Sequence, residues 1–373
     1  MQSPLIIGGG PAGAAAAAVI ANAGHRVRLI ERTAGPTDKV CGDFLSTGAI
    51  GVLTALGIGP QTLGAETINT LRLIHRDRVA ETRLPFPAMS LTRRTLDEAL
   101  LQHAASCGAE LLRGQAIRRL ESTANGFTAH TAEHAAIPAS TVFLATGKHD
   151  LRGTARPHRG GEPLGLKMYY RLAPAEQQAL RGCIELVLFS GGYAGLQMVE
   201  HGRAVLCLLT SAERYRRTGA DWNELLDSLA TEAPHLHRRL NGASACLDRP
   251  LAIAGIPYGH LYRPDRATPP ELFRLGDQAC VIPSFAGDGI AIAVASGQLA
   301  ATAWLHHRNA TDYHRRLLQR VRTPMRVASL FHRGCMMPLL QPVLAGIGRS
   351  WPAGMRLVAS ATRIAPATRF ATP

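Results

Sequence analysis

Hydrophobic residues near the start of the chain predict a strand, a tight turn, a helix and a second strand. In PLIIGGGPAGAAAAAVIANAGHRVRLIER, an apolar strand runs to Ile7, an Ala-rich helix spans about 12–23, and a strand over 26–30 leads to Glu31. This order is typical of a parallel β-α-β unit, and the small alanine side chains indicate a helix that packs close to the sheet. We therefore expect an α/β protein.

Helices and strands continue to alternate after this unit. The sequence predicts a helix over about 47–56, two strands on either side of Arg76-Asp77, and a helix followed by a strand within 91–112. The run STVFLATG (140–147) is apolar without alternation, which predicts a strand buried on both faces. These elements extend the first unit into a larger domain.

The pattern changes near residue 153 and later returns. Four strand-like runs and one helix near 222–231 predict an inserted domain built on a sheet, whereas 272–305 again predicts a strand, a loop and a long Ala- and Ile-rich helix. The first domain is therefore expected to be discontinuous. We place the boundaries at 1–152 and 264–322 for the first domain, 153–263 for the inserted domain with 68–88 as a candidate addition to it, and 323–373 for a basic, apolar C-terminal tail or cap.

Composition and charge exclude several classes of protein. The 373 residues are 46% hydrophobic, which is too apolar for a disordered chain, and no recurring uncharged runs of about 18 residues indicate a polytopic membrane protein. The formal net charge is +14, and ten arginines but no acidic residue lie between Tyr313 and Pro373. Such a surface could attract nucleic acid, an acidic partner or anionic lipid, although a general bias toward Arg and Ala explains it equally well.

The cysteines and the uncharged N-terminal run indicate in which cellular compartment the protein is expected. Seven cysteines form no C-x-x-C pair, and neither they nor the fifteen histidines show metal-ligand spacing, so we expect reduced thiols, a cytoplasmic protein and no metal site. The uncharged run over 1–24 has no basic residue ahead of it and contains GGGPAG. A glycine turn explains this run better than a signal peptide does.

The motif Gly8-x-Gly10-x-x-Gly13 directly follows the first strand and opens the first helix. Gly8 permits the tight turn, Gly10 lets the backbone approach a pyrophosphate, and Gly13 lets helix and strand pack closely. The helix start offers unpaired N–H groups to a phosphate, and Glu31 would accept hydrogen bonds from ribose hydroxyls. The pattern predicts a Rossmann-type dinucleotide site, and the alternative is a glycine turn without a ligand.

Five segments together resemble the FAD-dependent monooxygenase superfamily of the para-hydroxybenzoate hydroxylase fold, especially its geranylgeranyl-reductase-like branch. They are GGGPAG with Glu31, KVCGDFLS (39–46), Arg93 in RRTLDEAL, GGYAGLQMVEHGRAVL (191–206) and GDQACVIPSFAGDGI (276–290). The resemblance covers about residues 5–305 and implies a glutathione-reductase-like FAD domain with an inserted substrate domain. A protein that binds only NAD would not need the second, distant glycine site, so FAD is the expected cofactor.

The resemblance also implies which residues contact FAD. Asp277 would hydrogen-bond the ribityl chain, and the loop over 283–290 would direct backbone N–H groups toward the flavin ring. Arg93, or else Arg94, would lie against the cofactor, the alternative being a solvated helix face. The expected cofactor-binding residues are Gly8, Gly10, Pro11, Ala12, Gly13, Glu31, Arg32, Cys41, Gly42, Arg93, Gly147, Asp277, Pro283, Gly287, Asp288, Gly289 and Ile290.

Candidates for catalysis are Cys41, Lys167 and Tyr193. Cys41 would lie next to the flavin, and only Lys39 is close enough in sequence to lower the pKa of its thiol, so packing against the ring is favoured over a nucleophilic role. The other two belong to the inserted domain. Its candidate pocket residues are Lys167, Tyr169, Tyr170, Tyr193 and Gln197, and alternation places Lys167 with Tyr169, and Tyr193 with Gly195 and Gln197, on common faces.

Two departures from the family pattern bear on activity. Thr146-Gly147 stands where many hydroxylases have an Asp-Gly pair, so the mode of NAD(P)H docking stays open. Gly195 stands where the prenyl reductases tend to have an aromatic residue, and the W-x-W-x-I-P signature of the related halogenases is absent. The glycine at position 195 and the missing halogenase signature both favour a hydroxylase.

We therefore expect an FAD-dependent monooxygenase of secondary metabolism that hydroxylates a hydrophobic, phenolic or polyketide-like small molecule through a flavin hydroperoxide. NAD(P)H is the expected electron donor and O2 the co-substrate. The alternative is a flavin-dependent reductase of isoprenoid double bonds. Nucleic-acid binding is not expected because no motif supports it. We expect the tail to contact the inner face of a membrane peripherally or to cap a lipid-like substrate tunnel, the alternative being that it packs on the FAD domain with its arginines in solvent.

Overall fold

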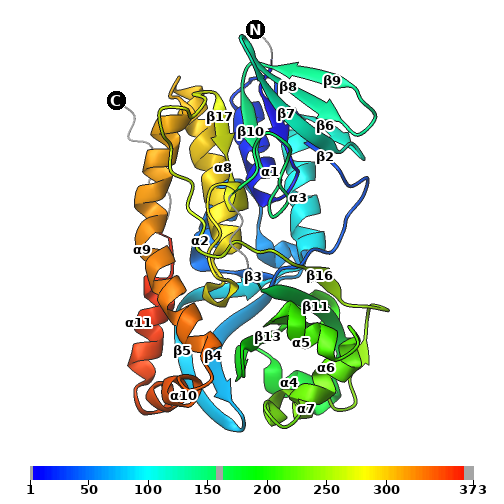
Figure 1. The fold of residues 1–373 in the computed structure, drawn as a ribbon, viewed down its shortest axis with the longest axis vertical. Coiled ribbons are helices and arrows are strands. Elements are labelled where there is room, and N and C mark those ends of the chain that lie inside the picture. The colour runs from blue at the N-terminus through cyan, green and yellow to red at the C-terminus, as the bar shows by residue number, and fades with distance from the viewer. Residues whose placement is uncertain (1–2, 157–162, 365–373) are drawn as a thin grey trace.

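A computed structural model describes residues 3–156 and 163–364. Within these residues the chain forms a five-stranded, a nine-stranded and a three-stranded sheet, with helices around the two larger sheets (Figure 1). The five-stranded sheet lies in the upper half of Figure 1, and the nine-stranded sheet lies in the lower half. The expected α/β class is confirmed.

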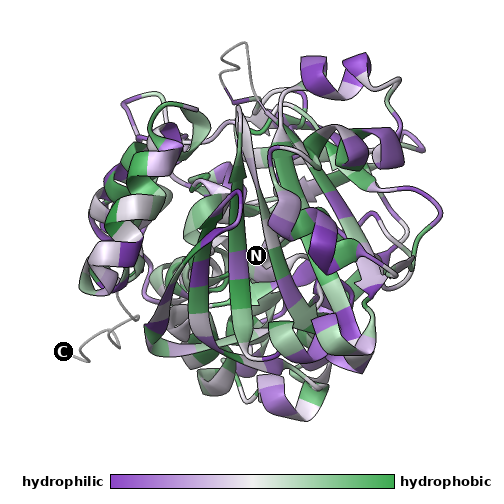
Figure 2. Ribbon diagram, turned by 90° about the horizontal axis from the view of Figure 1, so that it is seen from below, coloured by the Kyte–Doolittle hydropathy of each residue, from purple (hydrophilic) through white to green (hydrophobic). Residues whose placement is uncertain are grey.

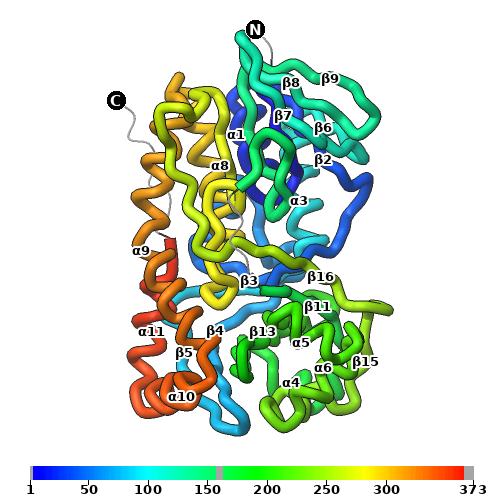
Figure 3. The backbone as a smooth tube through the Cα atoms, in the orientation of Figure 1, coloured from blue at the N-terminus to red at the C-terminus, as the bar shows by residue number. Residues whose placement is uncertain are grey.

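The five-stranded sheet is entirely parallel and has the strand order β17-β10-β1-β2-β6. Its strands are β1 (Leu5–Ile7), β2 (Arg28–Glu31), β6 (Glu110–Arg113), β10 (Val142–Leu144) and β17 (Leu272–Arg274). The last strand comes from the segment that follows the nine-stranded sheet. Figure 3 shows the chain returning from β16 past α8 to reach it.

Both faces of the parallel sheet are covered, which explains its unbroken apolar strands. Ile6 and Phe143 pack on the helical side. Leu5 and Leu144 pack against the three-stranded sheet on the other side. That small sheet consists of β7 (Ile117–Thr123), β8 (Gly126–Thr131) and β9 (Ala136–Ala139).

Within the described residues, five helices cover the parallel sheet, and two of them, α1 and α8, pack directly against each other. The five are α1 (Pro11–Asn22), α2 (Thr47–Ala55), α3 (Arg93–Ser106), α8 (Gly289–Leu305) and α9 (Ala310–Met336). Helix α8 crosses α1 at Gly297, where an added Cβ would lie 2.1 Å from the carbonyl oxygen of Ala12. Glycine is needed there because a side chain would push the two helices apart.

The nine-stranded sheet carries the inserted domain. Its order is β15-β11-β14-β13-β12-β4-β5-β3, with β16 also paired to β11. The strands are β3 (Phe44–Leu45), β4 (Glu66–His75), β5 (Arg78–Ser90), β11 (Leu164–Arg171), β12 (Cys183–Phe189), β13 (Gly192–Val199), β14 (Arg203–Thr210), β15 (Ser244–Ala245) and β16 (Leu251–Ile253). Strands β4 and β5, which contain the segment 68–88, belong to this sheet.

Four short helices accompany this sheet where the sequence predicted one. They are α4 (Pro174–Leu180), α5 (Ala212–Arg217), α6 (Trp222–Leu229) and α7 (Pro234–Leu240). Only α6 corresponds to the predicted helix. The others have six or seven residues, so they show too little of the 3.6-residue repeat to be recognised. Viewed from below in Figure 2, the short helices lie on the right of the large sheet and the C-terminal helices lie on the left.

The C-terminal part differs from the expected boundary at residue 323. Helix α9 continues through Pro324 to Met336, followed by α10 (Gln341–Ser350) and α11 (Pro352–Ala361). Met325 and Ala328 are buried in the main core and keep the helix on it beyond the proline. Proline usually ends a helix, whereas tertiary packing maintains this one across residue 323.

Candidate functional site

A cavity of about 360 Å³ lies between the parallel sheet, the large sheet and the C-terminal helices. It reaches from Gly10 at the start of α1 and Gly289 at the start of α8 to Met355 on α11. Most of the side chains that line it from the large sheet are apolar, among them Leu84 and Leu186. Its size and character are those of a site for a small molecule.

The glycine turn at the start of α1 has the predicted geometry. Gly8 has φ +107°, and an added Cβ would lie 2.4 Å from the carbonyl oxygen of Ala145. At Gly13 an added Cβ would lie 2.0 Å from the carbonyl oxygen of Gly8. Within residues 3–156 and 163–364 no side chain caps α1, so the N–H groups of its first turn are available to an anion at the cavity end that Gly10 lines.

Glu31 lies at the end of β2 beside this turn and is buried. Its carboxylate accepts hydrogen bonds from the backbone N–H of Gly9 at 2.6 Å and from the backbone N–H of Thr33 at 3.0 Å. Burial alone would raise the pKa of Glu31, but nearby Lys39 and these hydrogen bonds outweigh it and lower the pKa. The group is therefore an anion held in place, as an acceptor for sugar hydroxyls would need to be.

The second helix start, at α8, also faces the cavity. Gly287 has φ +66°, and among the residues that the structure describes no side chain caps the N–H groups of the first turn, where Gly289 and Ile290 line the cavity. The side chain of Asp288 turns the other way. It accepts hydrogen bonds from Ser46 Oγ at 2.5 Å and from the backbone N–H of Ile364 at 2.8 Å. Asp288 therefore holds the loop in place while the backbone faces the cavity.

The side chains of Arg93 and Arg94 lie in different places in the structure. Arg93 lines the cavity and makes a two-pronged ion pair with Asp97, at 2.6 and 2.7 Å. Burial opposes its charge, but Asp97 raises the pKa of Arg93. Arg94 instead pairs with Asp38 and is not among the residues lining the cavity. Arg93 is thus the arginine placed to approach a bound cofactor.

The loop over 39–43 lines the cavity with Val40, Cys41 and Gly42, and side chains of the large sheet hold it in place. Lys167 Nζ donates to the carbonyl oxygen of Lys39 at 3.0 Å, and Gln197 Nε2 donates to that of Gly42 at 2.8 Å. Cys207 Sγ lies 2.9 Å from the carbonyl oxygen of Cys41, and burial raises the pKa of the Cys207 thiol to about 12, so it keeps its proton. Three neighbouring strands thus anchor consecutive parts of one loop.

Asp43 completes this anchor. Its carboxylate is fully buried and accepts hydrogen bonds from Lys167 Nζ at 2.7 Å and from the Tyr169 hydroxyl at 2.8 Å. Burial alone would lower the pKa of Lys167, but Asp43 outweighs it and raises the pKa. Lys167 and Tyr169 therefore lie between the large sheet and the loop. They are not among the cavity-lining residues, contrary to their expected place in the pocket. Tyr170 lies on the opposite face, where its hydroxyl accepts a hydrogen bond from Trp222.

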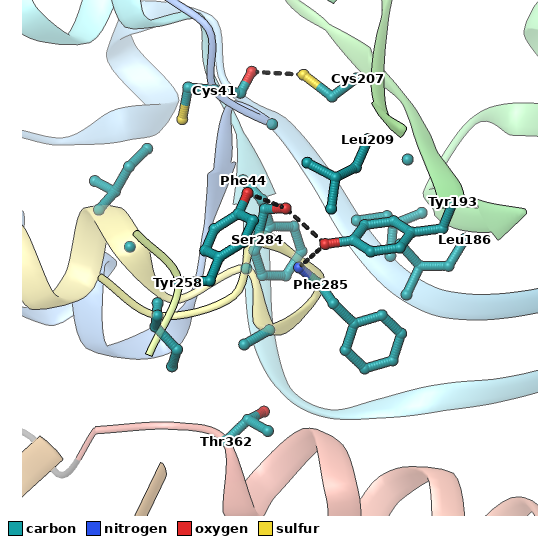
Figure 4. Close-up of a pocket in the computed structure, with 18 of the residues that line it drawn as sticks. Cys41, Phe44, Leu186, Tyr193, Cys207, Leu209, Tyr258, Ser284, Phe285 and Thr362 are labelled. Atoms are coloured by element: carbon teal, nitrogen blue, oxygen red, sulfur yellow. Dashed lines mark hydrogen bonds between the residues drawn. The ribbon is translucent and has the colours of Figure 1, made fainter. Parts of the chain in front are cut away.

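A cluster of hydroxyl groups marks the side of the cavity next to the α8 loop. Tyr193 Oη lies 2.7 Å from Ser284 Oγ, and Tyr258 Oη donates to the same Ser284 Oγ at 2.9 Å (Figure 4). The backbone N–H of Phe285 donates to Tyr193 Oη at 3.0 Å. Burial raises the pKa of Tyr193 well above its usual value, so this hydroxyl is protonated. The sequence singled out Tyr193, whereas Ser284 and Tyr258 were missed.

The predicted residues divide into two groups. Those that line the cavity are Gly10, Pro11, Ala12, Cys41, Gly42, Arg93, Gly147, Tyr193, Gln197, Asp277, Gly287, Gly289 and Ile290. Those outside its lining are Gly8, Gly13, Glu31, Arg32, Lys167, Pro283 and Asp288. The first two and Glu31 shape the glycine turn, whereas Arg32 is exposed and contacts His149. Over the described residues, no group of three or more His, Cys, Asp or Glu side chains could hold a metal ion.

The geometry fits FAD at both of its ends. A glycine turn with a bare helix start suits the pyrophosphate, with Glu31 beside it for a ribose. A second bare helix start suits the electron-rich edge of a flavin ring. The class defined by the fold and the site is thus that of a dinucleotide-binding α/β protein with an apolar substrate cavity.

Comparisons with known proteins specify this class further. Residues 2–143 match the family described as FAD binding domain. The chain is 34% identical over 115 residues to the menaquinone reductase of Mycobacterium tuberculosis, covering 30% of this chain and 28% of the relative. It is 33% identical over 85 residues to the squalene monooxygenase of Mus musculus, covering 22% of this chain and 15% of that one. Each match thus spans less than a third of the curated relative.

Solved structures share nearly the whole fold. The flavin-dependent brominase Bmp2 superposes with a TM-score of 0.78 and 15% identity, over 96% of this chain and 92% of its own. A geranylgeranyl bacteriochlorophyll reductase-like protein from Thermoplasma acidophilum gives a TM-score of 0.77 and 18% identity, over 96% of both chains. Residues 2–143 thus match an FAD binding domain, and the chain shares the fold of a flavin-dependent brominase and of a geranylgeranyl reductase-like protein, in agreement with the resemblance seen in its sequence.

Proposed function

We propose that this protein is an FAD-dependent monooxygenase that hydroxylates a hydrophobic small molecule bearing a phenolic or carbonyl oxygen. The observation that carries the proposal is the cavity itself. It begins at both helix starts suited to FAD, is walled by apolar side chains from the large sheet, and contains the Tyr193–Ser284–Tyr258 hydroxyl cluster. An apolar molecule with an oxygen substituent matches these walls and these hydroxyls.

Each part of the site has a role in this proposal. FAD, when bound, supplies the redox chemistry and the activation of O2, with NAD(P)H as the electron donor. The α1 turn and Glu31 hold the dinucleotide end, and Asp277 and the α8 start face its flavin end. The hydroxyl cluster orients the substrate oxygen by hydrogen bonds. Apolar residues such as Phe44 and Phe86 exclude water from the reacting atoms.

Gly195 favours a bulky substrate. It lies on β13 and lines the cavity, and a Cβ added there would meet Leu186 Cδ2 only at 3.8 Å, so the site has room for more than hydrogen. A larger side chain at this position would project into the cavity and reduce its volume. Glycine leaves that volume to the substrate.

A second candidate is reduction of an isoprenoid double bond. It is favoured by the similarity of part of the chain to the mycobacterial menaquinone reductases. The two candidates share the cofactor and the apolar cavity. They differ in the atoms that the substrate gains, one oxygen atom in the first case and two hydrogen atoms in the second.

The test uses the purified protein. Its visible spectrum should show bound FAD, and NADH or NADPH should bleach that spectrum without O2. Incubation of the reduced protein with a prenylated phenol or quinone, with and without O2, followed by mass spectrometry, separates the two candidates. A product that gains hydrogen and forms equally well without O2 contradicts hydroxylation. A protein that cannot be loaded with FAD contradicts both.

A further inference from the structure

Large apolar side chains are exposed at one end of the molecule. Of the nine such residues in the described parts of the chain, eight lie on or between α9, α10 and α11, and the ninth, Val79, lies in the β4–β5 hairpin against which α10 packs. We call these eight the apolar patch: Leu330, Met337, Leu339, Leu340, Val343, Ile347, Trp351 and Leu357. Leu339 is 87% exposed and Leu357 is 61% exposed. Large apolar side chains gathered on neighbouring exposed helices usually mark an interaction site.

The helices that carry the apolar patch also carry positive charge. Arg326, Arg333, Arg349 and Arg356 are exposed on the same three helices. Asp312, in the first turn of α9, is the last acidic residue of the sequence, so the parts of these helices that carry the four arginines contain no acidic side chain. Apolar side chains interleaved with arginines match a bilayer that contains anionic lipid, because its headgroups attract the arginines and its acyl chains accept the apolar groups.

The dimensions favour attachment over crossing. Helices α10 and α11 have ten residues each, about 15 Å, whereas a bilayer core is about 30 Å thick. None of the helices in the described ranges is long and apolar enough to cross a membrane. The apolar patch can therefore insert only into the interfacial region of the leaflet that it contacts.

The patch is continuous with the cavity of the candidate site. Ile347 and Trp351 are about half exposed at the surface and also line the cavity. Leu344 and Met355, on the inner sides of α10 and α11, line it as well. The cavity thus opens within the apolar patch, and an apolar molecule could pass from one to the other without crossing water.

We propose that the apolar patch docks on an anionic bilayer and that the substrate enters the cavity from the lipid between α10 and α11. The docking step stands on the surface residues alone, while the entry step rests on the proposed function. Point substitutions are the right perturbation because the end of α11 is built into the FAD domain. Arg363 pairs with Asp288 at 3.1 Å and Ile364 is buried, so removing the helices would disturb the cofactor site.

The docking test is sedimentation with vesicles of phosphatidylcholine, with or without phosphatidylglycerol. The full chain should bind the anionic vesicles and be released by salt. The double variant Leu339→Glu/Leu357→Glu should weaken binding by about tenfold or more, and Arg349→Gln should weaken it about fivefold. The matched control is Arg118→Gln, an exposed arginine on β7 at the opposite end of the molecule, which should leave binding unchanged. None of these residues lines the cavity, so FAD binding should survive.

Trp351 provides a second readout that does not depend on turnover. The chain has three tryptophans, and Trp351, unlike buried Trp222, is 54% exposed within the apolar patch. Its fluorescence should be quenched by brominated lipid in anionic vesicles, and Trp351→Phe should remove that signal.

The result that overturns the proposal is a protein that ignores anionic vesicles at low salt. A patch that instead forms dimers, which the double glutamate variant separates, would also overturn it in favour of a second copy. Failure of the proposed function looks different. In that case the vesicles still bind the protein, but no product forms from a detergent-solubilised substrate.

Discussion

The buried ion pair between Lys167 and Asp43 gives the sharpest prediction about the site. Both side chains are fully buried, and together they hold the loop over 39–43 against the large sheet. In Lys167→Met the ammonium group disappears while the Asp43 carboxylate stays buried, with the Tyr169 hydroxyl as its remaining close side-chain partner. Removing one member of a buried pair typically costs about 3–5 kcal/mol, because the other charge is left uncompensated.

Urea unfolding of the FAD-free protein, followed by circular dichroism, measures this cost. We expect Lys167→Met to lower the free energy of unfolding by about 3–5 kcal/mol. FAD affinity should fall as well, since Cys41 and Gly42 of the anchored loop line the cavity. The control is Arg217→Met, which breaks the exposed ion pair with Glu213 and should change the free energy of unfolding by less than about 1 kcal/mol.

A double variant distinguishes a lost charge from lost packing. Asp43→Asn/Lys167→Met removes both charges, and asparagine tolerates the left-handed backbone of position 43, where φ is +55°. It should regain more than half of the stability that Lys167→Met loses. If Lys167→Met costs less than about 1 kcal/mol, or the double variant is less stable still, the buried charge is not what anchors the loop.

Three further predictions concern the cofactor, the thiol and pH. Asp277→Ala and Glu31→Ala should each lose about one to two decades of FAD affinity in titrations, and unchanged affinity in both would remove these residues from the cofactor site. Cys41→Ser should keep turnover within about tenfold, whereas complete loss with FAD bound would show that the sulfur takes part in the chemistry. Burial would raise the pKa of Glu185, but hydrogen bonds from His235 and Arg239 lower it to about 2 from an ordinary 4.5. Its contribution to stability, about 3 kcal/mol, should therefore be complete above about pH 4.5 and lost as the pH falls toward 2. In Glu185→Gln, the free energy of unfolding measured with urea should depend less steeply on pH over that window. An equally steep dependence in that variant would refute the assignment.

Local sequence patterns determined the parts of this protein that depend on neighbouring residues. The strand, glycine turn and helix at 5–22 and the second glycine turn at 287–289 follow from backbone sterics and hydrophobic periodicity. Alternation along the large sheet also placed Tyr193, Gly195 and Gln197 on one face, and all three line the cavity. Such features need no knowledge of distant contacts.

Tertiary structure alone decided what the remaining candidates do. Lys167 lies on the cavity side of the sheet, yet Asp43, which precedes it by 124 positions, covers it and converts a candidate catalytic residue into an anchor. The C-terminal helices likewise carry apolar residues that line the cavity, face solvent or, like Ile347 and Trp351, do both. Periodicity identifies the face of an element on which a side chain lies, but what covers that face is set by contacts between residues far apart in the sequence.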